Sequence, residues 1–311
     1  MPSNSQNKPL KIAYILLIHK NPATVNALIR QLSNNSNADI YIHIDKKSCN
    51  SIASKIFRNE KTIVLNVNID TRWGDISLVD ATINLLRAAV NSGRQYDFVC
   101  LKSGQDLMIR DGFENFLAKN RDKIFMNAQR IEKNDKHSYF WKIKWPRYAR
   151  KQHDSALNPF RILRLALVYL YRLGINVRPN PDVFPMHVHR GSQWFCIPGY
   201  VAEYIINFVD KNDWYYNSLK DALAPDEYFF QTIIMNSQYS VNNVCNNLTY
   251  IRFGEAGRNR NHPVILKMGD VPEIEKSEKF FARKFDPAVD NSVIDYFMAK
   301  FPANQDYPLC E

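Results

Sequence analysis

The chain has 311 residues, 45% of them hydrophobic and 23% charged, with ten glycines and fifteen prolines. This composition indicates a globular protein and excludes low-complexity and fibrous classes, and no stretch reaches the roughly 18 uninterrupted apolar residues of a membrane span. The formal net charge of +10 favours partners that carry phosphate, such as a nucleotide donor, a nucleic acid or an anionic membrane surface, although solubility alone also accounts for it.

The N-terminal part of the chain alternates apolar strands with helices. A nearly continuous apolar run is typical of a strand buried on both faces of a sheet, and apolar residues spaced three and four apart are typical of a helix packed on that sheet. The expected elements are a strand at 11–18, a helix at 25–32, strands at 39–45 and 61–67, a helix at 76–90, and strands at 96–101 and 123–127.

This order of elements predicts an α/β fold with a largely parallel sheet. Ligands of such sheets bind beyond the carboxyl ends of the strands, and His19, Asp45 and Asp106 each follow the end of an expected strand. Loop residues are polar in any case, so one such residue means little, whereas three indicate a site. The chain lacks both the G-x-G-x-x-G fingerprint and the G-x-x-x-x-G-K-[ST] phosphate loop, so a nucleotide must be held by other groups.

Residues 139–171 differ from the rest of the chain because they mix aromatic and basic side chains with almost no acid. Arg161 to Leu173 is apolar and carries arginines at 161, 164 and 172. The pattern fits either an amphipathic helix on a membrane surface or a helix packed on the domain with its arginines reaching to water. Single-stranded nucleic acid ranks last as a partner, because no nucleic-acid-binding module is recognisable.

A second distinctive segment is APDEYFFQT, residues 224–232. Proline is tolerated at the first position of a helix, and Asp226 and Glu227 would then lie in the first turn, beside the positive end of the helix dipole. Two acids at a helix start occur without any catalytic role. In an apolar and aromatic surrounding, Glu227 is also a candidate general base.

The cysteines and the N-terminal residues indicate in which cellular compartment the protein is found. Five cysteines with no C-x-x-C pair predict reduced thiols and not a disulfide framework. The cysteines are Cys49, Cys100, Cys196, Cys245 and Cys310. Residues 1–8 are polar, so no signal peptide is predicted. We expect a cytoplasmic protein, peripheral at the inner membrane if its acceptor is held there.

Seven short segments occur in an order and spacing that match one enzyme family. They read AYILLIHK (13–20), IHIDKKS (42–48), WG (73–74), LKSGQD (101–106), GSQWF (191–195), PDE (225–227) and FARKFD (281–286). The set resembles the core-2/I-branching β-1,6-N-acetylglucosaminyltransferase family, which includes peptide O-xylosyltransferases. The match extends over about residues 11–297, and the segment from Ile131 to His189 matches poorly.

The resemblance implies a single domain of the glycosyltransferase A-type fold, with a Rossmann-like, mostly parallel sheet flanked by helices. Residues 1–130 would form the nucleotide-binding half, and residues 131–311 the acceptor and catalytic half. The family needs no divalent metal and no cofactor. In agreement with this, no Asp-x-Asp motif is clear, and no carboxylate or cysteine near His187 and His189 completes a metal site.

The resemblance also implies roles for individual residues. The catalytic glutamate of the family falls on Glu227. Basic side chains take the place of a metal at the donor diphosphate, and they fall on Lys284 and on Arg260, with Arg258 as the competitor for the second position. The remaining expected contacts are Ile18, His19 and Asp45 toward the uridine, and Asp106, Ser192 and Trp194 toward the saccharide.

These roles predict a metal-independent inverting glycosyltransferase that moves N-acetylglucosamine from UDP-GlcNAc to a saccharide hydroxyl. A bacterial member building a surface polysaccharide is expected, with a free or lipid-linked saccharide as acceptor and with no nucleic acid as partner. The alternatives are a UDP-xylose or UDP-galactose transferase of the same fold, or a non-catalytic carbohydrate-binding protein. The acceptor, the linkage position and the oligomeric state do not follow from the sequence.

Overall fold

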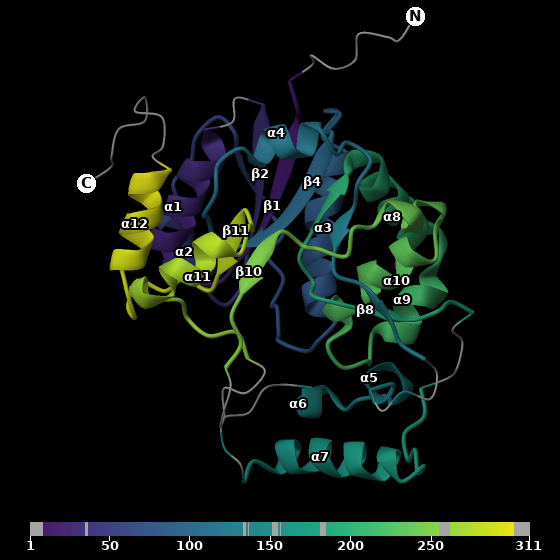
Figure 1. The fold of residues 1–311 in the computed structure, drawn as a ribbon. Coiled ribbons are helices and arrows are strands. Elements are labelled where there is room, and N and C mark those ends of the chain that lie inside the picture. Colours follow the sequence, from purple (N-terminus) through teal and green to yellow (C-terminus); the bar gives the residue numbers. More distant parts are fainter. Residues whose placement is uncertain are drawn as a thin grey trace, which may run out of the picture.

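A computed structural model of the chain describes residues 9–34, 37–132, 135, 137–150, 155, 157–180, 185–254 and 262–301. Within these residues the main sheet has six strands in the order β3-β2-β1-β4-β9-β6, and helices lie on both of its faces (Figure 1). Its strands are β1 (Ile12–Ile18), β2 (Ala38–Ile44), β3 (Thr62–Val64), β4 (Phe98–Ser103), β6 (Phe125–Met126) and β9 (Phe195–Pro198). Strands β1 to β4 run parallel, and β9 is inserted antiparallel between β4 and β6. The predicted A-type architecture, a mostly parallel sheet flanked by helices, is confirmed.

Side chains of successive strand residues point to opposite faces, so the sheet separates two hydrophobic cores. In β1, Tyr14 and Leu16 enter one core, and Ala13 and Ile15 enter the other. The first core is covered by α1 (Pro22–Ser33), α2 (Cys49–Ile52), α4 (Phe113–Ala118), α11 (Val271–Lys276) and α12 (Ser292–Lys300). The second is covered by α3 (Ser77–Val90), α8 (Gly199–Lys211), α9 (Asp213–Leu219) and α10 (Phe229–Met235). Burial on both faces explains why β1 reads as an apolar run.

A second, three-stranded sheet brings the C-terminal part of the chain to the end of β4. Its order is β10-β11-β5, formed by β10 (Thr249–Ile251), β11 (Phe281–Arg283) and β5 (Asp106–Met108). Arg283 is the register partner of Asp106 in the antiparallel pair of β11 and β5. Two-residue strands β7 (Gln129–Arg130) and β8 (His189–Arg190) form a further pair. Both larger sheets therefore combine strands from before and after residue 130.

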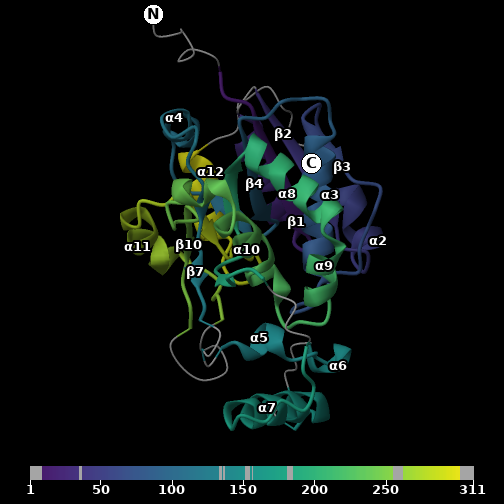
Figure 2. The same ribbon diagram turned by 90° about the vertical axis from the view of Figure 1, so that its right-hand side faces the viewer.

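Helices α5 (Tyr139–Lys142), α6 (Arg147–Arg150) and α7 (Pro159–Arg172) lie together at one end of the molecule, apart from the main sheet (Figures 1 and 2). They enclose a small core of their own, in which Trp145 and Leu167 are buried with Leu223. The Asn158 side chain caps α7 by accepting hydrogen bonds from the backbone N–H groups of Phe160 and Arg161, as expected of an N-cap residue. None of the helices in the described ranges has the length and hydrophobicity needed to cross a bilayer.

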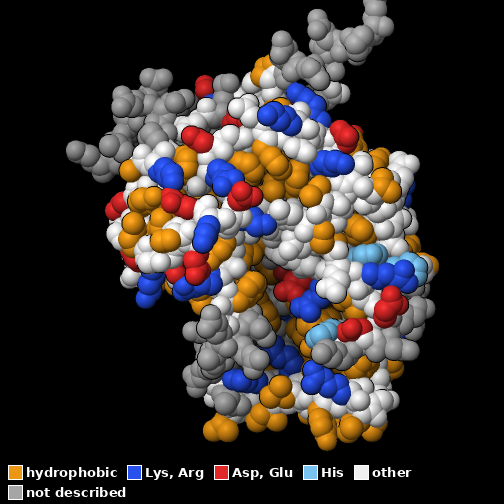
Figure 3. Space-filling model, in the orientation of Figure 1, with side chains coloured by type: hydrophobic (Ala, Val, Ile, Leu, Met, Phe, Trp, Pro, Cys, Tyr) orange, Lys and Arg blue, Asp and Glu red, His pale blue; other side chains and the backbone are white. Residues whose placement is uncertain are grey.

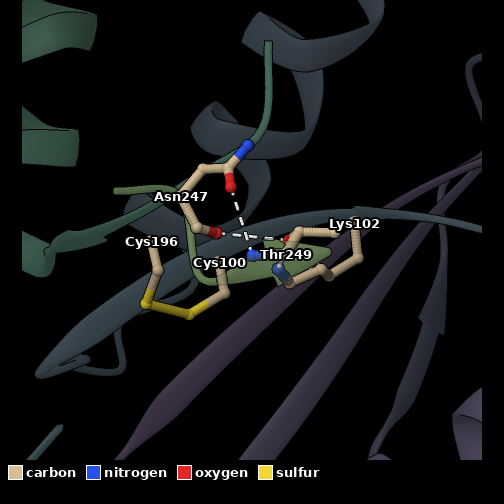
Figure 4. Close-up of a disulfide and its surroundings, with 5 residues drawn as sticks. All are labelled: Cys100, Lys102, Cys196, Asn247 and Thr249. Atoms are coloured by element: carbon tan, nitrogen blue, oxygen red, sulfur yellow. Dashed lines mark hydrogen bonds between the residues drawn. A yellow bond between two sulfur atoms is a disulfide. The ribbon is translucent and has the colours of Figure 1, made fainter. Parts of the chain in front are cut away.

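The prediction of five free thiols is wrong for one pair. Cys100 on β4 and Cys196 on β9 are register partners, both are fully buried, and the structure joins them in a disulfide (Figure 4). Cys49 and Cys245 are free, and Cys310 lies outside the described residues. The two bridged cysteines are 96 residues apart and meet only because β9 pairs with β4, which cysteine spacing does not reveal. The argument from cysteines for a reducing compartment therefore no longer holds.

Candidate active site

The carboxyl ends of β1 and β2 bring three predicted residues together. The Asp45 N–H donates to the carbonyl of Ile18 at 2.8 Å, which places Asp45 beside the start of the loop that carries His19. The Asp45 carboxylate accepts hydrogen bonds from the N–H of Lys47 at 2.8 Å and from the N–H and hydroxyl of Thr71. Only 3% of the Asp45 side chain is exposed. Asp45 thus holds the loop around Thr71 in place, and its expected contact with the uridine stays a prediction.

His19 borders the same edge of the sheet and is exposed on one side. Burial of the rest of the ring, followed by the nearby charge of Lys20, lowers its pKa below the usual 6.5, and Asp45 opposes this shift. Lys284 and Arg283 add smaller contributions in the same direction. At neutral pH the imidazole is therefore uncharged and can both donate and accept a hydrogen bond.

Asp106 and Arg283 form a buried ion pair behind this edge. Arg283 Nε lies 3.1 Å from Asp106 Oδ1, and neither side chain is more than 8% exposed. The Asp106 carboxylate also accepts from the N–H of Ser103 at 3.0 Å and from its hydroxyl at 2.7 Å. The Arg283 guanidinium stacks on the Trp194 ring, 3.9 Å from its centre. Asp106 and Trp194 therefore both hold Arg283 in place, and the saccharide contacts expected of them stay predictions.

Lys284 follows Arg283 directly and is only partly buried. Burial, then the charges of Arg283 and Lys20, lower its pKa from 10.5 to about 8. Lys20 is held by Asp286 at 3.0 Å, whereas Lys284 takes part in no salt bridge among the described residues. Cations that crowd together in this way form a site for an anion.

The other predicted phosphate ligands, Arg258 and Arg260, lie outside the described residues. Their segment leaves the described chain after Gly254 and returns at His262, and the Gly254 N–H donates to the carbonyl of His262 at 3.0 Å. Two residues further on, the carbonyl of Val264 accepts from the N–H of Lys284 at 3.5 Å. The described residues on the two sides of this gap are therefore paired with each other, and Val264 pairs with the backbone of Lys284.

Lys102 is a charged residue of this region that does not reach its surface. It is fully buried, donates to the Thr249 hydroxyl at 3.1 Å and lies 3.9 Å from the centre of the Phe281 ring. Figure 4 shows it beside Thr249, close to the disulfide. Burial lowers its pKa to about 8, and Asp106 opposes the shift. Lys102 therefore joins β4 to the second sheet beneath the site.

Glu227 lies at the other end of the site. It ends a 3-10 helix, Pro225–Glu227, whose first turn holds the proline and both acids, as predicted. This helix is a separate short element that precedes α10. Arg190 donates two hydrogen bonds to Glu227 Oε2, one of them from Nε at 3.0 Å, and its guanidinium lies 4.1 Å from the centre of the Phe140 ring. About a third of each of the two paired side chains is exposed. Within the described part of the chain, Oε1 of Glu227 accepts no hydrogen bond.

The neighbouring acid, Asp226, points into the protein. It is 8% exposed, and its Oδ1 has no hydrogen-bond partner among the described residues. Burial and then the charge of Glu227 raise the pKa of Asp226 to about 7. The two adjacent carboxyl groups therefore differ in environment, and Glu227 is the one that reaches the solvent.

The segment from Gly191 to Trp194 connects the two ends of the site. The Gly191 N–H donates to the carbonyl of Glu227 at 2.8 Å, the Ser192 carbonyl accepts from Gln231 of α10 at 2.8 Å, and Trp194 stacks on Arg283. A Cβ at position 191 would lie 1.7 Å from the carbonyl oxygen of Asn127, so only glycine fits there. Ser192 is thus positioned through its backbone between the acid and the cations.

Sequence reasoning missed two residues of this arrangement. Arg190 directly precedes the GSQWF segment, and only the antiparallel pairing of β7 and β8 together with the turn at Pro225 brings it to Glu227. Arg283 belongs to the FARKFD segment, but the role of diphosphate ligand was predicted for its neighbour Lys284. Metal ligands are not grouped in the described ranges, where no three His, Cys, Asp or Glu side chains are arranged to hold an ion.

Comparison with known proteins places this arrangement in a family. The model of the Core-2/I-Branching enzyme family matches residues 12–280. The chain belongs to the Core-2/I-Branching enzyme family. The match includes the ends of β1 and β4, the Gly191–Trp194 segment and Glu227. It ends just before the FARKFD segment, which carries Arg283 and Lys284.

Curated relatives of this family member are xylosyltransferases. The Xylosyltransferase of Ciona intestinalis is 24% identical over 323 residues, covering 97% of this chain and 35% of that protein. Xylosyltransferase 1 of Homo sapiens is 25% identical over 332 residues, covering 97% and 32%, and Xylosyltransferase 2 of Mus musculus is 26% identical over 316 residues, covering 92% and 33%. The chain thus spans about a third of the length of these relatives.

A solved structure is also similar to part of the chain. The apo form of mouse xyloside xylosyltransferase 1 is 11% identical, covers 72% of this chain and 81% of its own, and has a TM-score of 0.32.

Proposed function

We propose that this Core-2/I-Branching enzyme is a metal-independent inverting glycosyltransferase that moves N-acetylglucosamine from UDP-GlcNAc to a saccharide hydroxyl in β linkage. The observation that carries the proposal is that the segment Gly191–Trp194 has a carboxylate at one end and positive charges at the other. Glu227 offers a carboxylate oxygen at one end, and Lys284 with Lys20 offers positive charge at the other. Single displacement needs a base on one side of the sugar and charge stabilisation on the other.

Glu227 would take the proton of the acceptor hydroxyl. Arg190 binds Oε2 and fixes the carboxylate in one orientation, which leaves Oε1 to accept the hydrogen bond from the attacking hydroxyl. As the oxygen attacks the anomeric carbon of an α-linked donor from the opposite face, its proton passes to Glu227 and the product is β-linked. A positioned carboxylate contributes about 10²–10⁴-fold to such a step.

The cations would stabilise the leaving diphosphate. Negative charge grows on the diphosphate as the glycosidic bond breaks, and fixed positive groups lower the energy of that state. Lys284 would serve as a point charge, and Arg258 or Arg260 as a bidentate partner. Ile18 and His19, at the end of β1, would border the uridine. Asp45, Asp106 and Trp194 would act by positioning the loops and Arg283.

A donor panel tests the proposal. Purified protein is incubated with UDP-GlcNAc, UDP-xylose and UDP-galactose, with and without EDTA, and the released UDP is measured. We expect release that EDTA does not abolish, highest with UDP-GlcNAc. Strict dependence on Mn²⁺ or Mg²⁺ would contradict the metal-independent mechanism, and no release from any donor would favour a carbohydrate-binding protein.

Xylose is the second candidate donor, because the curated relatives are named xylosyltransferases. The groups that would bind the nucleotide and the diphosphate contact the part of the donor that UDP-GlcNAc and UDP-xylose share. The donor panel separates the two, since highest turnover with UDP-xylose would replace N-acetylglucosamine by xylose. The acceptor that we propose is a saccharide of a bacterial surface polysaccharide, made by a cytoplasmic enzyme.

The affinity for UDP is expected to fall as the pH rises above about 8, the pKa of Lys284 in the free protein. A bound diphosphate raises that pKa, so above it the free protein must take up a proton in order to bind. The dissociation constant should then rise by up to about tenfold per pH unit. Titration calorimetry from pH 7.5 to 9.5 measures this effect above the range in which the terminal phosphate itself titrates, near about 6.

Lys284→Arg is the control for the pH dependence. An arginine stays charged throughout this range, so the variant should bind UDP with a nearly constant dissociation constant. The charges that act on the pKa of Lys284 are those of Arg283, Lys20 and Asp106, and they are unchanged in the variant. A wild-type affinity that is constant up to pH 9.5 would remove Lys284 from the diphosphate site.

A further inference from the structure

A surface helix usually turns its apolar side chains to the protein and its charged side chains to water. In α7, several apolar side chains face the water, and Arg161 and Arg164 are half-buried. Its buried side carries Leu167, with Tyr171 partly buried against the small core. Arg164 also lies on the half-buried side, 6.0 Å from the centre of the Trp73 ring, and burial lowers its pKa. The arginines at 161 and 164 therefore do not form the outer face of the helix, as a membrane-surface helix with outward arginines would require.

The outer face of α7 consists of apolar side chains. Ile162, Leu165 and Tyr169 are 50%, 58% and 64% exposed, and their spacing of three and four places them on one side of the helix. The apolar strip continues after the helix, where Leu173 and Ile175 are 58% and 50% exposed. Figure 3 shows hydrophobic side chains along this edge of the molecule, below a hollow lined by charged groups.

The exposed charges that the described residues of 139–180 place around the strip are positive. Lys144, Arg147, Arg172 and Arg178 are exposed in the same part of the structure, and residues 139–180 contain no acidic side chain at the positions that the structure describes. An apolar ridge bordered by basic groups matches the boundary between the acyl chains and the anionic headgroups of a lipid leaflet.

The size of the strip favours a lipid surface over a protein partner. One face of a 14-residue helix measures about 21 Å by about 10 Å. This area is far below the roughly 800 Å² that each partner contributes to a standard interface. The strip also lies on the outermost helix at that end of the molecule (Figures 1 and 2), where a flat surface can meet it without obstruction.

We propose that the outer face of α7, with Leu173 and Ile175, inserts shallowly into an anionic leaflet. The small core links this face to the candidate site, because Tyr171 of α7 contacts Tyr139, Tyr139 stacks on Phe140, and Phe140 lies under Arg190. Docking would bring Glu227 close to the membrane surface. Membrane binding itself is independent of sugar transfer, whereas the proposed use of a lipid-linked saccharide as acceptor rests on the proposed function.

Co-sedimentation with vesicles tests the proposal. Wild-type protein is mixed with vesicles of phosphatidylcholine alone or with about one third phosphatidylglycerol, at about 0.1 M and about 1 M salt, where screening lengths are about 10 Å and about 3 Å. We expect strong binding to the anionic vesicles at low salt and weaker binding at high salt. Equal binding to both kinds of vesicle, or binding to neither, would overturn the proposal.

A triple variant identifies the surface. Ile162→Ser, Leu165→Ser and Tyr169→Ser together should lower the partition coefficient at least about tenfold. The matched control replaces Val241, Val244 and Val289, which are 83%, 47% and 48% exposed elsewhere, by serine and should change it less than about twofold. Affinity for UDP and the circular dichroism spectrum show that both variants are folded. Unchanged binding of the α7 variant would refute the assignment, and so would a wild-type dimer in sedimentation velocity that this variant dissociates.

Discussion

Glu227→Gln is expected to lower kcat by about 10²–10⁴-fold, the usual contribution of a general base. Glutamine keeps the shape of the side chain and can still accept from Arg190, but it cannot take up the proton of the acceptor. The dissociation constant for UDP should stay within about twofold, because Glu227 and the cations around Lys284 lie at opposite ends of the segment from Gly191 to Trp194. Steady-state kinetics with the best donor of the panel, together with calorimetry for UDP, measure the two quantities.

Glu203→Gln is a suitable control for this variant. Glu203 is an exposed carboxylate on α8, so its replacement removes the same charge without touching the site and should leave kcat unchanged. If Glu227→Gln retained activity within a few-fold of wild type, Glu227 would not be the base. A parallel loss of UDP affinity would indicate that the substitution disturbs the whole site.

Lys284→Ala is expected to weaken UDP binding by about 10–150-fold, which corresponds to the 1.5–3 kcal/mol typical of a charge-assisted contact. The effect should appear in both the affinity and kcat, because the same charge also stabilises the leaving group. Calorimetry with UDP gives the first quantity, and kinetics at saturating donor give the second.

Lys276→Ala removes an equal charge from the exposed surface of α11 and controls for the loss of net charge. Its effect on UDP affinity should be small and should disappear as salt is added, since exposed charges are screened. Equal losses of UDP affinity in the two variants would mean that the affinity depends only on the overall positive field of the protein.

The central strands of the main sheet could be predicted because a strand that is buried on both faces is rich in apolar residues. β1 reads as an apolar run and β2 as an alternation of isoleucines with Tyr41 and His43, and both were placed within one residue of their observed bounds. The edge strand β3 and the short strand β6 were predicted too long, because apolar residues at the ends of a strand do not show where its hydrogen bonding stops. The antiparallel insertion of β9 was not predicted, since strand order depends on pairing between segments far apart in the chain.

The candidate site, too, could be predicted only in part from the sequence. Residues at strand ends were correctly gathered at one edge, because the topology of a parallel sheet requires it. The sequence did not reveal which carboxylates face a ligand and which hold loops, and Asp45 and Asp106 proved to be buried hydrogen-bond acceptors. The partner of Glu227 was missed because Arg190 reaches it across 37 residues of chain.

The small core beneath α7 also has a consequence for how this end of the molecule can change in sequence. Phe140 and Trp141 of α5 pack into the second core of the main sheet, whereas Trp145 and Leu167 are buried against Leu223, apart from both cores of that sheet. Substitutions there should accordingly have little effect on the folding of the nucleotide-binding scaffold. Leu167 is the buried side chain that α7 adds to that core, whereas Phe140 of α5 contacts Arg190, the partner of Glu227. α7 can therefore diverge or be exchanged more readily than α5 while the contacts around Glu227 are retained.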